Sequence, residues 1–263
     1  MTEWKTLVKK SVPAFIQRPL CYMRSRDTQE DMVACIAFLR NRNLNTTFLD
    51  RLRIVNRLYA ISRHVNSPHA QQEILQYIQS ILSLPSSNKG VLVEVGCFKG
   101  GSTAKFSLAA DIVERELVVF DSFQGIPETI EPHGKSILGG NSSFKRGDYC
   151  ATLDEVKANV AQFGVIKRCR FIPGWVEDTL PRFNEAVSAI YLDVDLASAT
   201  RTCLKYLFPL LENGGVLYSH DCHLPLVIDV FNNEEFWVKE VGCRRPRVQG
   251  LGERELVKIT KDN

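Results

Sequence analysis

The strongest constraint on the fold is a regular alternation of short apolar runs and helix-like segments between residues 91 and 221. Between the runs, apolar residues recur at spacings of three and four, as on one face of a helix. Strands that alternate with helices of this length form a parallel sheet that helices cover on both faces. The sequence therefore predicts a doubly wound, mostly parallel α/β sheet. The expected strands are VLVEVG (91–96), ELVVFDSF (116–123), CRFIPGW (169–175), AVSAIYLDVD (186–195) and GVLYSHD (215–221).

The segments that flank this alternating region have different patterns. Helical spacing of apolar residues fills residues 28–85, and a polar linker, SLPSSNKG, follows. We therefore expect an N-terminal helical cap over residues 1–88 and a main domain over residues 89–263. Near the end of the chain, FWVKEVG (236–242) and ERELVKIT (253–260) are interpreted as a closing pair of strands.

Two long loops are expected around the sheet. The segment Gln124–Tyr149 is rich in Gly, Ser and Pro, and loops of this length are usually functional or disordered. We interpret it as a lid over residues 124–149. The second loop, CRRPRVQGLG, carries Arg244, Arg245 and Arg247, which could hold an anionic acceptor but are interpreted as a solvated surface.

Charge and composition exclude several classes of function. Residues 1–65 hold 12 Lys and Arg against 5 Asp and Glu, but these charges are spread along helical patterns rather than massed in a block. No apolar run reaches the roughly 18–20 residues that span a bilayer. We therefore expect no nucleic-acid partner and no membrane partner.

The cysteine pattern bears on the compartment. The eight cysteines are scattered without a CxxC motif, and the N-terminal residues lack the apolar core of a secretory signal. These features predict free thiols and a cytoplasmic location.

A glycine-rich turn follows the first expected strand, in VEVGCFKGGST. Glycines let a ligand approach the backbone, and the following helix offers free N–H groups, but neither the P-loop ending nor GxGxxG is present. Glu94 would repel a pyrophosphate and suits an ammonium, while Asp121 could accept both hydroxyls of a ribose. This pair favours S-adenosylmethionine over NAD, with Gly174 and Trp175 bordering the adenine. The candidate cofactor-binding residues are Glu94, Gly96, Cys97, Gly100, Ser102, Asp121, Ser122, Gly174, Trp175 and Asp193.

Carboxylates gather where the fourth and fifth expected strands end. Asp193 and Asp195 are two apart on one strand and would point the same way, and His220 and Asp221 end the next. Such a group needs a cation or a shared proton, and its donors fit Mg²⁺, Mn²⁺ or a related ion. We expect Asp193, His220 and Asp221 to bind a metal that activates a substrate hydroxyl, with Asp195 as general base. The alternative interpretation is that these acids cap the following helix and loop.

The motifs in this region resemble those of the macrocin O-methyltransferase family. They are VEVGCFKGGSTA, VFDSFQGIPE, LDEVKANVAQFG with RFIPGWVEDTLP, and YLDVDLASAT with LLENGGVLYSHD, and they cover roughly half of the chain. The resemblance implies a Rossmann-like methyltransferase fold and an S-adenosylmethionine-dependent, usually metal-dependent enzyme that methylates hydroxyls of sugars and natural products. It also implies that Asp193 is a metal ligand and that Asp195 is the base.

The chain departs from the family pattern at His220, where the family has an aspartate. A nitrogen donor there could shift the preference from Mg²⁺ toward Mn²⁺, Fe²⁺ or Zn²⁺, or weaken metal binding. Two alternatives stay open: a metal-independent methyltransferase, and a catalytically silent binding domain on the same fold. The expected acceptor is a small molecule with a hydroxyl group, and the expected assembly is a homodimer.

Overall fold

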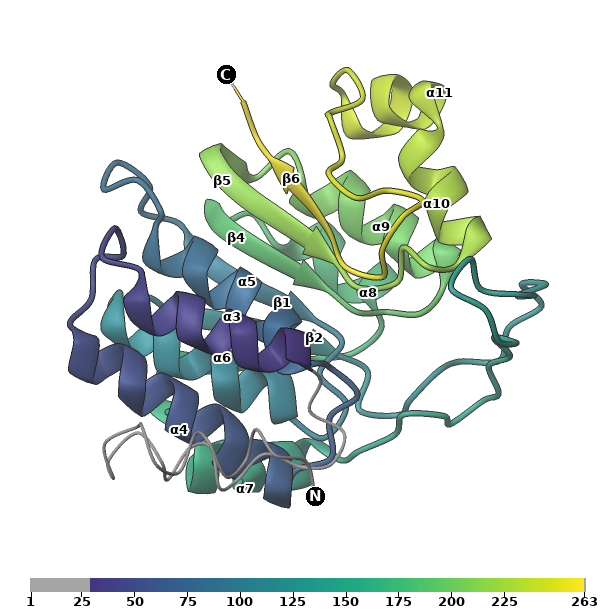
Figure 1. Cartoon of the computed structure of the whole chain (residues 1–263). Coiled ribbons are helices and arrows are strands. Elements are labelled where there is room, and N and C mark those ends of the chain that lie inside the picture. Colours follow the sequence, from purple (N-terminus) through teal and green to yellow (C-terminus); the bar gives the residue numbers. More distant parts are fainter. Residues whose placement is uncertain (1–28, 263) are drawn as a thin grey trace.

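The protein contains one six-stranded sheet, as the computed structural model, which describes residues 29–262, shows (Figure 1). The strand order is β3-β2-β1-β4-β5-β6. All pairs are parallel except β5 with β6, which is antiparallel. The expected doubly wound, mostly parallel fold is therefore confirmed. The strands are β1 (Val91–Val95), β2 (Leu117–Asp121), β3 (Cys169–Pro173), β4 (Val187–Leu192), β5 (Leu211–Ser219) and β6 (Val257–Thr260).

Helices cover both faces of the sheet (Figure 1). On the first face, α5 (Gln71–Leu82) and α6 (Gly101–Ile112) pack against the strands, and α3 (Gln29–Arg40), α4 (Phe48–His64) and α7 (Leu153–Phe163) pack on these two helices. The second packs against α8 (Val176–Thr179), α9 (Ala197–Leu207), α10 (Pro225–Asn232), α11 (Glu234–Phe236) and the π-helical turn η3 (Trp237–Val241). Short 3₁₀ turns lie at η1 (Ile166–Arg168) and η2 (Leu180–Arg182).

Side-chain alternation along each strand divides the core into two clusters. Leu92 of β1 packs with α4, α5 and α6, whereas its neighbours Val93 and Val95 pack with α8, α9 and η3. Successive side chains of a strand point to opposite faces, and both faces of this sheet are dry, which explains the near-continuous apolar runs in the sequence.

The N-terminal helices do not have a separate core. Side chains of α3, α4 and α5 lie in the same cluster as Leu92, Tyr191 and Tyr218 of the sheet. The boundary expected at residue 88 stays a prediction, and residues 1–28 of the expected cap lie outside the described part. No helix within residues 29–262 is long and apolar enough to cross a membrane. The seven cysteines in that part are free, and Cys21 lies outside it.

The tail differs from the expectation of two closing strands. FWVKEVG is helical in α11 and η3, and only the second segment forms a strand, β6. Asn233 caps α11 by accepting the N–H of Phe236, and Phe236, Trp237 and Val241 turn one buried face toward α9. The spacing of these three buried residues fits one face of a helix better than the alternation of a strand, so the expectation of a strand here is wrong.

The helical spacing in SATRTCLKYLFPLLENGG (198–215) predicts a helix up to the fifth strand, but the structure ends this helix earlier. α9 stops at Leu207, near Pro209, and β5 begins at Leu211 rather than at Gly215. Proline cannot donate the backbone hydrogen bond that would continue the helix. The residues after it pair with β4, where Leu211 lies opposite Val187.

Gly96, just after β1, lies against the backbone of Asp193, just after β4, and this predicts a severe effect of Gly96→Ala. Its φ is 82°, and an added Cβ would lie 1.8 Å from the carbonyl oxygen of Asp193. We expect the variant to lose at least about 2 kcal/mol of unfolding free energy, from backbone strain and displacement of the β4 end. Urea denaturation measures this loss.

Gly134→Ala is the matched control, because an added Cβ there meets nothing within 4 Å. It should change the unfolding free energy by less than about 1 kcal/mol. Equal effects of the two substitutions would show that the contact between Gly96 and Asp193 does not constrain the fold.

Candidate active site

A cavity of about 350 Å³ opens at the carboxyl ends of the parallel strands. It lies where the chain order reverses, because β1 has β2 on one side and β4 on the other. Open α/β sheets bind ligands at such a point. The walls come from the ends of β1, β2, β4 and β5, from the loop 124–149 and from the linker between α4 and α5.

The glycine-rich turn forms one wall of this cavity. Gly96 and Gly100 both have positive φ, at 82° and 78°, and the turn leads directly into α6. The N–H of Cys97 donates to Asp121 Oδ2 at 2.7 Å, and the N–H of Phe123 donates to Asp121 Oδ1 at 2.7 Å. Asp121 therefore joins the turn to the end of β2, and each of its oxygens retains a lone pair for a ligand.

Glu94 lies behind this wall rather than on it. Its side chain is completely buried, and its carboxylate oxygens make no hydrogen bond that meets ordinary geometry. Burial raises the pKa of Glu94 to about 8, against the opposing effect of the Ser102 and Thr103 hydroxyls. A buried carboxyl group whose oxygens lack hydrogen-bond donors needs a nearby cation, or it binds a proton and becomes neutral.

The structure brings most of the expected cofactor-binding residues together. Glu94 and Gly100 do not line the cavity: Gly100 packs against Val156 and Val160 of α7 instead. Those that do line it are Gly96, Cys97, Ser102, Asp121, Ser122, Gly174, Trp175 and Asp193.

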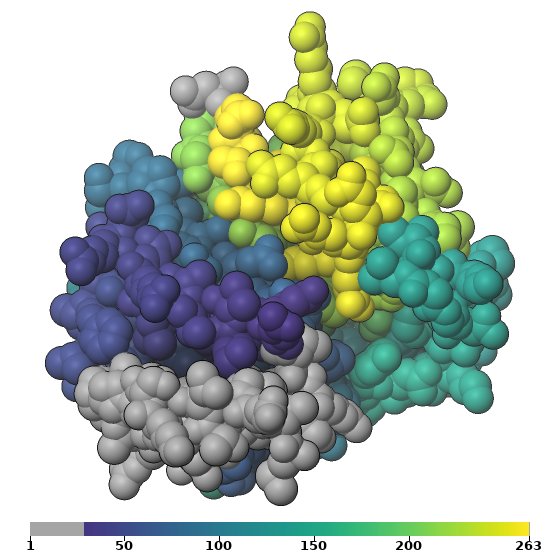
Figure 2. Space-filling view, viewed as in Figure 1, coloured from purple at the N-terminus to yellow at the C-terminus, as the bar shows by residue number. Residues whose placement is uncertain are grey.

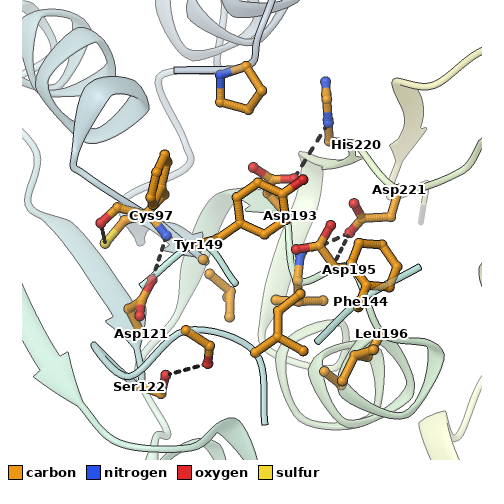
Figure 3. Close-up of a pocket in the computed structure, with 18 of the residues that line it drawn as sticks. Cys97, Asp121, Ser122, Phe144, Tyr149, Asp193, Asp195, Leu196, His220 and Asp221 are labelled. Carbon is orange, nitrogen blue, oxygen red and sulfur yellow. Dashed lines mark hydrogen bonds and ion pairs between the residues drawn. The ribbon is translucent and has the colours of Figure 1, made fainter. Parts of the chain in front are cut away.

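Asp195 stands in a strained turn at the opposite wall (Figure 3). The sequence suggested that Asp193 and Asp195 are two positions of one strand. In the structure β4 ends at Leu192, so both residues lie after the strand. The N–H of Leu196 donates to the Val194 carbonyl at 2.6 Å, which closes a three-residue turn, and the central Asp195 has a φ of 60°. Strained turns of this kind persist only where the surroundings hold them.

Asp221 is what holds that turn. Its Oδ2 accepts the N–H of Val194 at 2.9 Å and the N–H of Asp195 at 3.0 Å. Burial raises the pKa of Asp195, and the carboxylates of Asp221 and Asp193 raise it further. Burial and Asp193 also raise the pKa of Asp221. Asp221 therefore accepts N–H groups from the turn that follows β4, rather than from the helix or loop that follows Asp221 itself.

Asp193 is paired with two histidines. Its Oδ2 lies 2.9 Å from His69 Nε2, and its Oδ1 lies 3.5 Å from His220 Nδ1. Burial raises the pKa of Asp193, but the two imidazoles outweigh it and hold that pKa below the ordinary range. The other nitrogen of His220 lies 3.3 Å from Glu73 Oε2.

Two groups of side chains in the described part of the chain have the spacing of metal ligands. They are His69 with Asp193 and His220, and Glu73 with His220 and Glu255. Asp193 and His220 of the expected set recur here, whereas Asp221 belongs to neither group. His69, which sequence reasoning missed, belongs to the linker before α5. Its only signal is a histidine in a polar SPH segment, which resembles an ordinary helix start.

Residues of the loop 124–149 line the cavity, and the loop contacts the C-terminal part of the chain (Figure 2). The N–H of Ile137 donates to the carbonyl of His223 at 3.0 Å. Phe144 and Tyr149 line the cavity, and the Tyr149 ring lies 5.6 Å from the Phe98 ring of the glycine-rich turn. None of the three arginines of the basic loop lies on the cavity wall.

Glu131 fastens this loop to the start of α9. Its carboxylate accepts the N–H groups of Ala197 and Ser198, both at 2.9 Å, and contacts His133 Nε2 at 2.8 Å. A carboxylate at the start of α9 satisfies free N–H groups and complements the helix dipole. The two N–H groups that Glu131 accepts lie two and three residues beyond Asp195.

Replacing Glu94 with Gln should change the pH dependence of stability. The folded-state pKa of about 8 lies above the ordinary 4.5, so the folded protein binds more protons than the unfolded chain between these values. Stability is therefore lost as pH rises through that window, by about 1.4 kcal/mol for each unit that separates the two pKa values. We expect Glu94→Gln to gain stability relative to the wild type as pH rises from 5 to about 8. Urea unfolding at several pH values measures this, and parallel pH profiles would contradict it.

Removing the carboxylate of Glu131 should loosen the loop. We expect Glu131→Ala to lose about 1 kcal/mol of unfolding free energy and to speed amide exchange across residues 124–149, because the start of α9 loses its acceptors. Hydrogen exchange with mass spectrometry measures the second effect. Glu128→Ala, an exposed acid of the same loop, is the control, and equal exchange in both variants would rule out the anchor.

Comparison with known proteins adds several relatives and structural neighbours. A tetracenomycin-derivative 4'-O-methyltransferase of Streptomyces olivaceus is 32% identical over 153 residues, which are 56% of this chain and 58% of that protein. The mycinamicin III 3''-O-methyltransferase of Micromonospora griseorubida is 31% identical over 143 residues, 52% of this chain and 56% of that protein. The chain thus spans a little over half the length of these curated relatives.

Two solved structures share the fold. The O-methyltransferase NovP matches with a TM-score of 0.58 and 20% identity, over 98% of this chain and 100% of that one. The calicheamicin methyltransferase CalS11 matches with a TM-score of 0.55 and 17% identity, over 90% and 93%. The family model described as macrocin-O-methyltransferase (TylF) matches residues 72–234, which include the two cavity walls described above. Since this match covers more than half of the chain, the protein belongs to the macrocin O-methyltransferase family.

Proposed function

We propose that this protein transfers a methyl group from S-adenosylmethionine to a hydroxyl group of a small molecule, with a sugar or natural-product acceptor as the substrate class. The observation that carries the proposal is that one cavity joins the glycine-rich turn and Asp121 to Asp195. Family membership and the names of the relatives, which are O-methyltransferases, support the same reaction. The proposed place of action is the cytoplasm.

The cofactor wall suits S-adenosylmethionine. Asp121 offers an acceptor on each oxygen for the ribose hydroxyls, and Gly174 and Trp175 border the cavity next to β2. The carboxyl group of Glu94 lies behind Ser102 and is poorly compensated in this structure, as a residue that serves a cationic ligand would be. The bound cofactor supplies the electrophilic methyl group and a positive charge.

Asp195 is the proposed general base. It lies on the cavity wall with a raised pKa, so it retains a proton once it has taken one from a substrate hydroxyl. A cation in the cavity lowers that pKa and returns Asp195 to the ionised form that a base requires. The tight turn and the two hydrogen bonds to Asp221 keep the carboxyl group in place before the substrate arrives, which reduces the entropic part of the barrier.

A divalent metal fits the donors of the same wall. Asp193 and His220, which belong both to the set expected from the sequence and to a group with the spacing of metal ligands, would hold it. When bound, the metal would polarise the substrate hydroxyl and lower its pKa. Tyr149 and Phe144 line the cavity beside these acids and would exclude water from the acceptor.

Asp195→Asn should separate cofactor binding from turnover. Loss of a general base typically costs 10²–10⁴ in rate, so we expect a fall of roughly that size in methyl transfer from labelled donor to a panel of glycosylated acceptors. The affinity for S-adenosylmethionine, measured by isothermal titration, should change only a few-fold, because the cofactor wall is intact.

Asp178→Asn is the matched control, since Asp178 is exposed and does not line the cavity. Failure of the wild-type protein to bind S-adenosylmethionine, with or without divalent metal, would remove the enzyme proposal and favour the silent binding domain. Full turnover after metal removal by a chelator would favour the metal-independent alternative.

A further inference from the structure

We propose that His69, Asp193 and His220 form a site for a divalent transition-metal ion that takes nitrogen ligands, and that this site prefers such an ion to Mg²⁺. The proposal takes up the metal of the proposed function, but it rests on the geometry of three side chains. Its test involves no turnover, so a failure of methyl transfer leaves it standing.

The three side chains converge from two separate parts of the fold. His69 comes from the linker before α5, whereas Asp193 and His220 follow β4 and β5. The distances from the carboxylate to the two imidazoles are 2.9 Å and 3.5 Å, and the three ligand atoms lie within 4.8 Å of one another. Metal bonds of about 2.1 Å separate the ligands of a tetrahedral ion by about 3.4 Å, which small side-chain rotations reach from here.

Each histidine is oriented by a second partner on its outer nitrogen. Ser67 Oγ lies 3.0 Å from His69 Nδ1, and Glu73 Oε2 lies 3.3 Å from His220 Nε2. The inner nitrogens, Nε2 of His69 and Nδ1 of His220, face Asp193. Metal-binding histidines ordinarily have such a partner, which fixes the ring and selects the nitrogen that binds.

Burial favours the same interpretation. The side chains of His69 and His220 are only 3% and 8% exposed, while Asp193 is 20% exposed and lines the cavity. One face of the site therefore remains open to the cavity, as in catalytic rather than structural metal sites.

Glu73 and Asp221 serve other groups and do not complete the ligand set. The second oxygen-and-nitrogen group contains Glu73, but the same Glu73 oxygen accepts the N–H of Ala70 at 2.9 Å. Asp221 directs Oδ2 at two backbone N–H groups. Glu73 thus contacts Ala70 and His220, and Asp221 holds the turn at Val194 and Asp195.

The donor set decides the preference among metals. Mg²⁺ favours oxygen ligands and retains several waters, whereas two imidazoles with one carboxylate suit Fe²⁺, Zn²⁺ and Co²⁺. In this chain His220 stands where the family has an aspartate, and His69 is a further nitrogen donor. The site therefore offers two nitrogen donors and one carboxylate rather than carboxylates alone.

The test is a titration of the chelator-treated full-length protein with Co²⁺, followed by its visible d–d absorption. We expect one equivalent to bind, Zn²⁺ to displace it, and a large excess of Mg²⁺ to leave the spectrum unchanged. The proposal would be overturned in favour of a hydrogen-bonded His–Asp–His cluster if Co²⁺ did not bind. It would also be overturned if any one of these three results failed to appear.

Variants identify the ligands. His69→Gln retains a polar group near Asp193 but is a poor ligand, and it should weaken Co²⁺ binding by at least ten-fold. His64→Ala, at the end of α4 and outside the cavity, is the matched control and should bind Co²⁺ as the wild type does. Circular dichroism and thermal melting establish that both variants are folded.

Asp221→Asn distinguishes this ligand set from the one that the sequence suggested. Asn retains an acceptor for the backbone N–H groups, so we expect a smaller loss of Co²⁺ affinity than in His69→Gln. A larger loss in Asp221→Asn, or unchanged affinity in folded His69→Gln, would assign the metal to Asp193, His220 and Asp221 and overturn the proposal.

Discussion

The ends of β1 and β4 lie so close together that no side chain fits between them. The N–H of Asp193 donates to the Val95 carbonyl at 2.9 Å, and the carbonyl of Asp193 occupies the place where a side chain of Gly96 would start. This contact puts the glycine-rich turn and the acidic cluster on opposite walls of one cavity. A methyl donor and a hydroxyl acceptor must meet at van der Waals distance, so the proposed chemistry depends on this approach.

Burial of several carboxyl groups around that cavity is costly, and the chain compensates each one differently. Asp193 has two imidazoles, Asp221 has two backbone N–H groups, and Asp121 has one N–H group on each oxygen. Glu94, Asp195 and, despite its two N–H partners, Asp221 keep raised pKa values. Glu94 lies behind the cofactor wall, where the proposal requires a cationic cofactor, and Asp195 lies on the opposite wall, where it requires a base. Perturbed groups of this kind are typical of functional sites.

The helices before the sheet contribute to the site as well as to the core. The linker from Asn66 to His69 lines the cavity, and Glu73 of α5 contacts His220. Tyr77 of the same helix packs against Tyr191 and Tyr218 beneath the strands. A segment that looked like a cap in the sequence is therefore part of the wall, because the linker before α5 and the first turn of α5 lie beside the end of β5.

The sequence by itself determined the alternation of strands and helices and the strand end at which each acid lies, because period and position at strand ends are local properties. It also indicated Asp195 and the cofactor wall. It misread FWVKEVG, where a buried helical face and a strand have similar composition. Only the tertiary structure decided that Asp221 braces a turn, that Glu94 lies behind the wall and that His69 faces Asp193. Those facts depend on contacts between residues far apart in the chain, up to 124 positions for His69 and Asp193, which no local pattern records.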